Sequence, residues 1–242
     1  MRGGGVSLFV SLLLAHIVIY LTSNDPVSLA WFGNLMQWIG VMFGLIYVLR
    51  IAKTSTKPDF SRWMYLAFGL LLMLLGQTLL SYSELVLKTP AYGSISDAFW
   101  LIGFSAIVIG LFQMARTVSS NKSLLIAHVV GCIILAGVVW YSWELLSNPK
   151  RGHYIKVLDV SYSLLEIWMF VLAALIALNS EIKKPWMLAA VCLVFLVFVD
   201  AVIIYFHDIE SPVYRYFDIF YFTGFSAWWL LGATYPVKAP SV

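Results

Sequence analysis

Long apolar runs separated by short polar turns follow one another along almost the whole chain. Eight of these runs are long enough to cross the roughly 30 Å hydrocarbon core of a bilayer as helices. They cover residues 5–22, 27–50, 63–87, 95–115, 123–146, 157–179, 186–206 and 216–235. The pattern therefore predicts an all-α integral membrane bundle of eight transmembrane helices, with residues 1–242 forming a single transmembrane domain.

Two ten-residue segments within this pattern share most of their residues. Residues 97–106 read D-A-F-W-L-I-G-F-S-A, and residues 218–227 read D-I-F-Y-F-T-G-F-S-A, 121 positions later in a chain of 242. Such self-similarity is the signature of an internal duplication, with repeats at about 1–118 and 119–242. Because each repeat holds an even number of spans, we expect two parallel four-helix repeats with spans four and eight at the centre.

Composition agrees with a membrane location. The chain is 62% hydrophobic and only 11% charged, with a mean hydropathy of +0.90, whereas soluble domains carry roughly 25% charged residues. Cys132 and Cys192 lie inside predicted spans, so neither a disulfide framework nor a cysteine metal site is expected. The common catalytic and nucleotide-binding motifs are missing, and we expect no enzyme, no metal site and no nucleic-acid partner.

The distribution of basic residues predicts the orientation. With a cytoplasmic N-terminus, ten of the lysines and arginines lie on the cytoplasmic side and five on the outer side. This asymmetry favours both termini in the cytoplasm. Most acids then lie near the outer ends of the spans, so ligand-facing chemistry is expected at the outer rim.

The third and seventh spans carry matching polar positions. Aligning Gln77 with Asp200 also aligns Tyr82 with Tyr205 and places Glu84 against His207. Ionisable groups inside a span are costly and normally face the bundle interior or a wet cavity. Two interpretations of Asp200 remain open: a hydrogen bond to a neighbouring Tyr, Ser or backbone group, or a role with a ligand, proton or ion.

Asp97 has a local explanation that its duplicate lacks. Ser94 and Asp97 match a capping box, in which the serine caps the start of a helix and the acid reaches back. No serine precedes Asp218 at that spacing, so capping does not account for both acids. In the sixth span, Tyr162 and Glu166 lie four residues apart on one helical face, and Glu166 is expected to be buried and hydrogen-bonded within the protein.

Histidines raise the question of haem. Ligation by two histidines needs both at similar depth on facing helices, and only His16 with His207 could meet that requirement. We therefore do not expect haem, and no other cofactor is indicated.

Residues 76–104 resemble the multi-span N-terminal membrane sensor region that precedes many bacterial diguanylate cyclase and phosphodiesterase domains. That region carries a P-Y-P-S-x-A-D-x-F-Y-L-x-G-Y pattern, matched here by Pro90, Tyr92, Ser94, Asp97, Phe99, Trp100 and Gly103. Gln77 stands where the family often has Asp, and no cyclase output domain follows the last span. The resemblance implies a sensory module of a bacterial cytoplasmic membrane.

Three functional hypotheses follow. The first is a non-enzymatic sensory or binding module that acts through a protein partner in trans. The second is an accessory structural subunit of an electron-transfer or photosynthetic complex that packs against lipid, quinone or pigment. The third is a small-molecule or ion transporter. Under the first hypothesis, the candidate ligand-binding residues are Gln77, Tyr82, Glu84, Asp97, Trp100, Asp200, Tyr205, His207, Asp218 and Tyr221.

Overall fold

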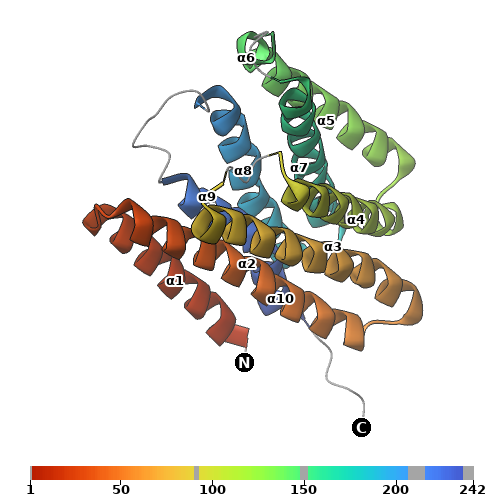
Figure 1. Cartoon of the computed structure of the whole chain (residues 1–242). Helices are drawn as coiled ribbons and strands as arrows, with labels where there is room; N and C mark the ends of the chain where they lie inside the picture. The colour runs from red at the N-terminus through yellow and green to blue at the C-terminus, as the bar shows by residue number, and fades with distance from the viewer. Residues whose placement is uncertain (1, 90–92, 148–151, 207–215, 237–242) are drawn as a thin grey trace.

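The computed structural model describes residues 2–89, 93–147, 152–206 and 216–236, and this part of the chain consists of helices and short connections (Figure 1). The helices are α1 (Arg2–Thr22), α2 (Pro26–Thr54), α3 (Lys57–Ser81), α4 (Ile95–Val118), α5 (Asn121–Tyr141), α6 (Trp143–Ser147), α7 (His153–Asn179), α8 (Lys183–Phe206), α9 (Phe217–Phe225) and α10 (Ala227–Thr234). A π-helix, η1 (Tyr82–Leu87), continues α3. Within the described residues there is no strand.

Seven of the predicted spans are confirmed as continuous helices. In the described part of the chain, seven helices are long and apolar enough to cross a membrane. Several run further than the sequence predicts, and only Ser55 and Thr56 separate α2 from α3. The basic residues Arg50, Lys53 and Lys57 therefore lie on helices.

The eighth predicted span is present as two short helices. α9 and α10 meet at Ser226, and neither is long enough to span a membrane alone. Helical hydrogen bonds nevertheless continue across the junction, from the Ser226 N–H to the Phe222 carbonyl at 3.0 Å and from the Leu230 N–H to the Ser226 carbonyl at 2.9 Å. The expected span is therefore interrupted rather than missing.

Glycines allow the closest helix contacts. A Cβ atom added to Gly69 of α3 would lie 2.5 Å from the carbonyl oxygen of Gly103 on α4. On α2, a Cβ at Gly40 would lie 3.1 Å from Ser226 Oγ, and one at Gly44 would lie 3.0 Å from Trp228 Cβ. The small-residue spacing of Gly40 and Gly44 is therefore used against α9 and α10, as such spacings are in membrane bundles.

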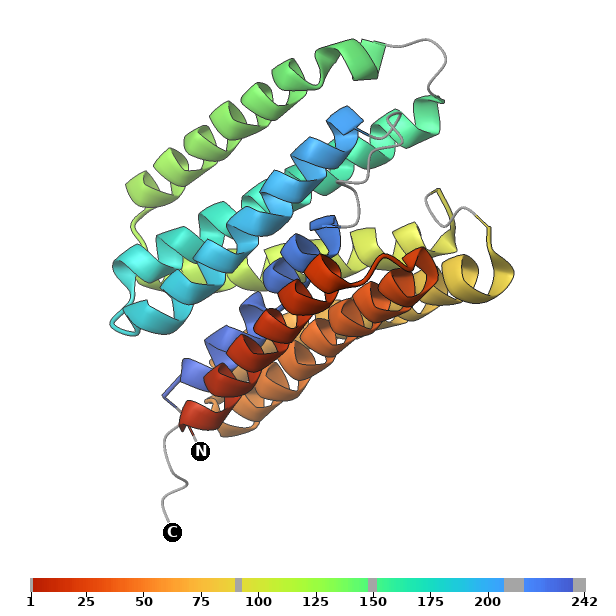
Figure 2. The same ribbon diagram turned by 90° about the vertical axis from the view of Figure 1, so that its left-hand side faces the viewer.

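α1 begins close to where α10 ends. A Cβ at Gly5 would lie 2.9 Å from Ala233 Cβ. Figure 2 shows the first residues of α1 and the last residues of α10 at the same end of the bundle. The duplicated segments also meet, since the rings of Trp100 on α4 and Phe225 on α9 are 5.0 Å apart. α5 lies at the outside of the bundle and packs mainly against α7.

Polar side chains cap helices at the ends of the bundle. Asp25 accepts hydrogen bonds from the backbone N–H groups of Val27 and Ser28 at 3.3 and 3.2 Å, which caps α2. A further hydrogen bond from the Ser28 hydroxyl to the Asp25 carboxylate is the main reason that the pKa of Asp25 lies below its usual value. Such a carboxylate favours the start of a helix, where backbone N–H groups lack partners.

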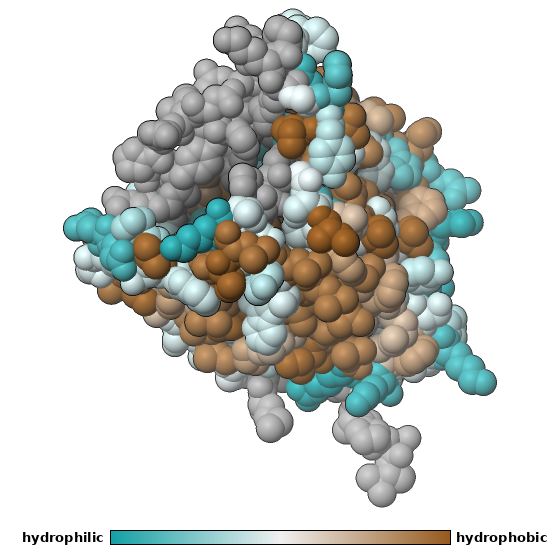
Figure 3. All heavy atoms as spheres, viewed as in Figure 1, coloured by the Kyte–Doolittle hydropathy of each residue, from teal (hydrophilic) through white to brown (hydrophobic). Residues whose placement is uncertain are grey.

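The surface is apolar across the middle of the bundle. Figure 3 shows apolar side chains over the middle of the viewed face and hydrophilic ones toward its ends.

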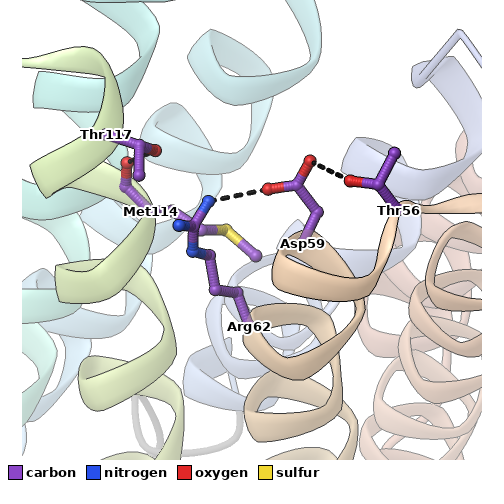
Figure 4. A network of polar contacts seen from close by, with 5 residues as sticks. All are labelled: Thr56, Asp59, Arg62, Met114 and Thr117. Atoms are coloured by element: carbon purple, nitrogen blue, oxygen red, sulfur yellow. Dashed lines mark hydrogen bonds and ion pairs between the residues drawn. The ribbon is translucent and has the colours of Figure 1, made fainter.

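At the turn between α2 and α3, Arg62 Nη1 lies 2.7 Å from Asp59 Oδ1, and the Thr56 hydroxyl donates to Asp59 at 3.2 Å (Figure 4). This is the only ion pair among the described residues.

Candidate functional site

Asp218 is the meeting point of three helices. The Tyr20 hydroxyl of α1 donates to Asp218 Oδ2 at 2.6 Å, and the Gln37 amide of α2 donates to Asp218 Oδ1 at 2.8 Å. Gly33 makes room for this arrangement, because a Cβ at that position would collide with the Asp218 carboxylate and lie 2.6 Å from the Tyr20 hydroxyl oxygen. Both carboxylate oxygens of Asp218 are thus bound by neutral donors from other helices.

Asn34 extends the polar contacts from α2 to α3 and η1. Its amide nitrogen donates to Glu84 Oε2 at 3.2 Å and to the Ala30 carbonyl at 3.1 Å. Its amide oxygen accepts from Gln77 Nε2 at 3.1 Å and from Ser81 Oγ at 2.7 Å. We call the whole group the α2 cluster: Tyr20, Asn34, Gln37, Gln77, Ser81, Glu84 and Asp218.

One buried acceptor in the α2 cluster has no partner. The contacts of Asn34 fix its orientation, so Gln77 must present its nitrogen to Asn34 and turn its oxygen away. Gln77 is 0% exposed, and its Oε1 has no hydrogen-bond partner. Glu84 lies at the exposed end of the same network. The α2 cluster therefore has hydrogen-bond acceptors at its exposed end, on Glu84, and in its interior, on Gln77.

A second polar group is centred on α7. The Tyr162 hydroxyl donates to Asp97 Oδ1 at 2.7 Å, which joins α7 to α4. Asp97 Oδ2 accepts from the backbone N–H groups of Gly93 and Ser94 at 2.7 and 2.8 Å. The predicted capping box of Ser94 and Asp97 is confirmed, and Asp97 is satisfied by local donors and by one tyrosine.

Glu166 lies one helical turn beyond Tyr162 and contacts a second carboxyl group. Glu166 is buried, and its side chain is hydrogen-bonded to that of Asp200 on α8. Tyr221 of α9 donates its hydroxyl to Asp200 Oδ1 at 2.6 Å, and Asp159 of α7 is near enough to repel the charge of Asp200. We call the group the α7 cluster: Asp97, Asp159, Tyr162, Glu166, Asp200 and Tyr221.

The ten candidate ligand-binding residues do not form one lining. Gln77, Glu84 and Asp218 belong to the α2 cluster, whereas Asp97, Asp200 and Tyr221 belong to the α7 cluster. Trp100 is buried against Phe225 between the duplicated segments, and Tyr82 is 52% exposed on η1. His207 and the side chain of Tyr205 lie outside the described residues.

Sequence reasoning overlooked four members of the α2 cluster. Asn34 and Gln37 are not among the ten candidate residues, although two amides three residues apart on one side of a span already indicate a polar interior contact. Tyr20 and Ser81 carry no such local signal, because their partners lie on other helices. Of the two interpretations of Asp200, the hydrogen bond to a neighbouring tyrosine is present.

His16 packs among aromatic rings. Its ring lies 4.8 Å from that of Tyr20 and 5.3 Å from that of Phe32, and both imidazole nitrogens lack a hydrogen-bond partner. His207, the other half of the pair considered for haem, is outside the described residues. Among the residues that are described, no three His, Cys, Asp or Glu side chains are grouped so as to hold a metal ion.

The two clusters are built from carboxyls, amides and hydroxyls, and the bonds between their side chains run from helix to helix. This chemistry can bind a ligand that donates hydrogen bonds, or a proton. Comparison with protein-family models, with curated proteins and with solved structures finds no match to this chain.

Proposed function

We propose that the protein is a non-enzymatic sensory or binding module of a bacterial cytoplasmic membrane, which acts through a protein partner in trans. The observation that carries this proposal is the α2 cluster, whose hydrogen bonds join α1, α2, α3 with η1, and α9. A ligand that donates hydrogen bonds to Glu84 or Gln77 would compete for the bonds that hold these helices together. Ligand binding would then shift the helices relative to one another, and the partner would respond to that shift.

The proposed orientation places both termini in the cytoplasm and the α2 cluster toward the outer side. The excess of basic residues at one set of helix ends supports it, as does the closeness of the start of α1 to the end of α10. A shift of α1 or α10 would then reach the cytoplasmic surface, where a signalling partner is expected.

We also propose that the two halves are parallel repeats related by a two-fold axis. The acid of each duplicated segment contacts a middle helix of the other half, since Asp97 accepts from Tyr162 of α7 and Asp218 accepts from Gln37 of α2. This exchange of partners is what a two-fold relationship between the halves predicts. The resemblance of residues 76–104 to bacterial sensor regions supports the sensory theme.

A structural subunit of a larger membrane complex is the second candidate. The observation that favours it is α5, which packs mainly against α7 and leaves large apolar side chains exposed: Leu125, Ile126, Val129, Ile133 and Trp140. In a lone protein this face meets lipid, whereas in a complex it would pack against another subunit, a quinone or a pigment.

Purification of the native protein in a mild detergent distinguishes the candidates. We expect mass spectrometry to identify a signalling protein as its partner, and the absorption spectrum of the same fraction to show no visible chromophore. Redox or pigment-binding subunits that co-purify with bound colour would overturn the sensory proposal and establish the structural one.

Paired variants then test the role of the α2 cluster. Gln37→Leu removes a donor from Asp218, whereas Leu35→Ala alters a neighbouring α2 side chain that is 52% exposed. The activity of the co-purified partner should change with Gln37→Leu and stay unchanged with Leu35→Ala. Equal partner activity in the two variants would show that the α2 cluster does not transmit a signal to the partner.

A further inference from the structure

Glu166 and Asp200 hold two carboxyl groups in contact inside the bundle, and this contact requires a proton. Glu166 is 2% exposed, and its side chain is hydrogen-bonded to that of Asp200 on the neighbouring helix. An ionised carboxylate has acceptors only, and two of them side by side repel each other. One of the two groups must therefore carry the hydrogen that the bond contains.

The surrounding contacts assign that proton to Glu166. Asp200 accepts a hydrogen bond from the Tyr221 hydroxyl at 2.6 Å, and a hydrogen bond of this kind favours the ionised form of a carboxyl group. Glu166 Oε2 is buried and has no partner. An unpartnered buried oxygen is far less costly on a neutral carboxylic acid than on a carboxylate.

Among the described residues, no cation is paired with Glu166 or Asp200. Asp159 on α7 repels Asp200, Tyr221 faces the pair from α9, and Asp97 faces α7 from α4 through Tyr162. On the α5 side, His128 accepts a hydrogen bond from Trp168 of α7, and α10 has no titratable side chain. Within the described residues, the only ion pair lies far away at the turn between α2 and α3.

We propose that Glu166 and Asp200 form a proton-binding site in the membrane-spanning part of the protein. The site holds one proton between α7 and α8, carried by Glu166 and donated to Asp200. Loss of the proton leaves two negative charges in contact in a low-dielectric interior, which separates α7 from α8. This proposal does not depend on the sensory function, and it assigns a pH response to the contact between α7 and α8.

Infrared spectroscopy of the purified protein in mild detergent near neutral pH tests the site directly. The wild type should show the C=O stretching band of a protonated carboxylic acid. Glu166→Gln should abolish this band, because glutamine has no carboxyl group. Asp200→Asn should keep the band but shift its frequency, because a buried Glu166 stays protonated and donates to the asparagine oxygen instead of to a carboxylate. Asp97→Asn is the matched control, since Asp97 accepts only from N–H and O–H donors, and the band should remain.

The pH dependence of thermal unfolding gives a second readout. We expect the unfolding midpoint of the wild type to fall as the pH rises above neutral, and the midpoint of Glu166→Gln to change less over the same range. A wild type without the band would overturn the proposal, even if neither substituted protein could be prepared. A band that is unchanged in Glu166→Gln, or a Glu166→Gln variant with an unchanged pH dependence, would also overturn it.

Discussion

The α2 cluster and the α7 cluster both place polar side chains inside the bundle, but they satisfy them with different chemistry. In the α2 cluster, the amide of Gln77 donates to the amide of Asn34, and an amide carries a donor and an acceptor at any pH. In the α7 cluster, Glu166 meets Asp200, and two carboxyls can form a hydrogen bond only with a proton. The contact between α2 and α3 and the contact between α7 and α8 therefore differ in whether they depend on a proton.

The two duplicated segments show a related difference. Asp97 is held mainly by donors close to it in the chain, at Gly93 and Ser94. Asp218 stands in the same ten-residue pattern but accepts from Tyr20, which is 198 positions away in the sequence. The same acid thus combines local capping with a contact to α7 in the first copy, whereas in the second copy it contacts α1 and α2. Only the first copy is preceded by a capping serine.

The largest effect is expected from the glycines of the two duplicated segments. Gly103→Ala should destabilise the protein by about 2–3 kcal/mol, because the added Cβ would meet the backbone carbonyl oxygen of Gly69 at 2.8 Å and overpacking costs about that much. Gly224→Ala meets the side chain of Leu196 instead. Unfolding in mild detergent measures both changes.

A second substitution separates these two cases. Trimming Leu196 to alanine should recover part of the stability lost in Gly224→Ala, whereas no side-chain trimming can move the Gly69 backbone. A double-mutant cycle reports this coupling. If Gly103→Ala proved as stable as the wild type, the close approach of α3 and α4 would be wrong.

Tyr20→Phe should lower stability by about 2 kcal/mol, the usual value of a hydrogen bond to a charged group. The substitution keeps the ring and removes the donor to Asp218 Oδ2. Tyr82→Phe serves as the control, since Tyr82 is 52% exposed and should change stability little. Equal unfolding midpoints for the two variants would mean that Asp218 does not depend on α1.

Gln77→Glu should make the contact between Gln77 and Asn34 depend on pH. A neutral glutamic acid can donate to the Asn34 oxygen, whereas an ionised glutamate cannot and leaves a buried charge beside Asn34 and Glu84. Stability should therefore fall as the pH rises, by about 1 kcal/mol or more for each pH unit in the affected range. Thermal unfolding measured over a series of pH values checks this, with Gln77→Met as the non-titrating control.

Ser94→Ala should have the smallest effect, about 1 kcal/mol, which is typical for loss of a helix cap. Ser94 Oγ accepts from the Ser96 N–H at 3.2 Å at the start of α4. Thermal unfolding and amide hydrogen exchange of the first turn of α4 measure the loss. Protection in α9 should not change, and a loss there would show that the two segments are coupled more tightly than their separate contacts suggest.

Features set by neighbours in the chain could be predicted from the sequence. The apolar runs predicted the seven continuous spanning helices, because a helix satisfies its own backbone hydrogen bonds in lipid. The spacing of Ser94 and Asp97 predicted the capping box, since both residues lie in one turn. The spacing of Gly40 and Gly44 on one face of α2 is likewise a local feature, and it allows the close contact with α9 and α10.

Contacts between distant helices were decided by the tertiary structure. Nothing in the sequence indicated that Asp218 would accept from Tyr20 and Gln37, or that the ten candidate residues would divide between two clusters. The interruption of the last span at Ser226 was also not predicted. The physical reason is that helix packing depends on how whole faces fit together, and a shift of one turn between two helices changes every side-chain partner without altering the hydrophobic pattern of either.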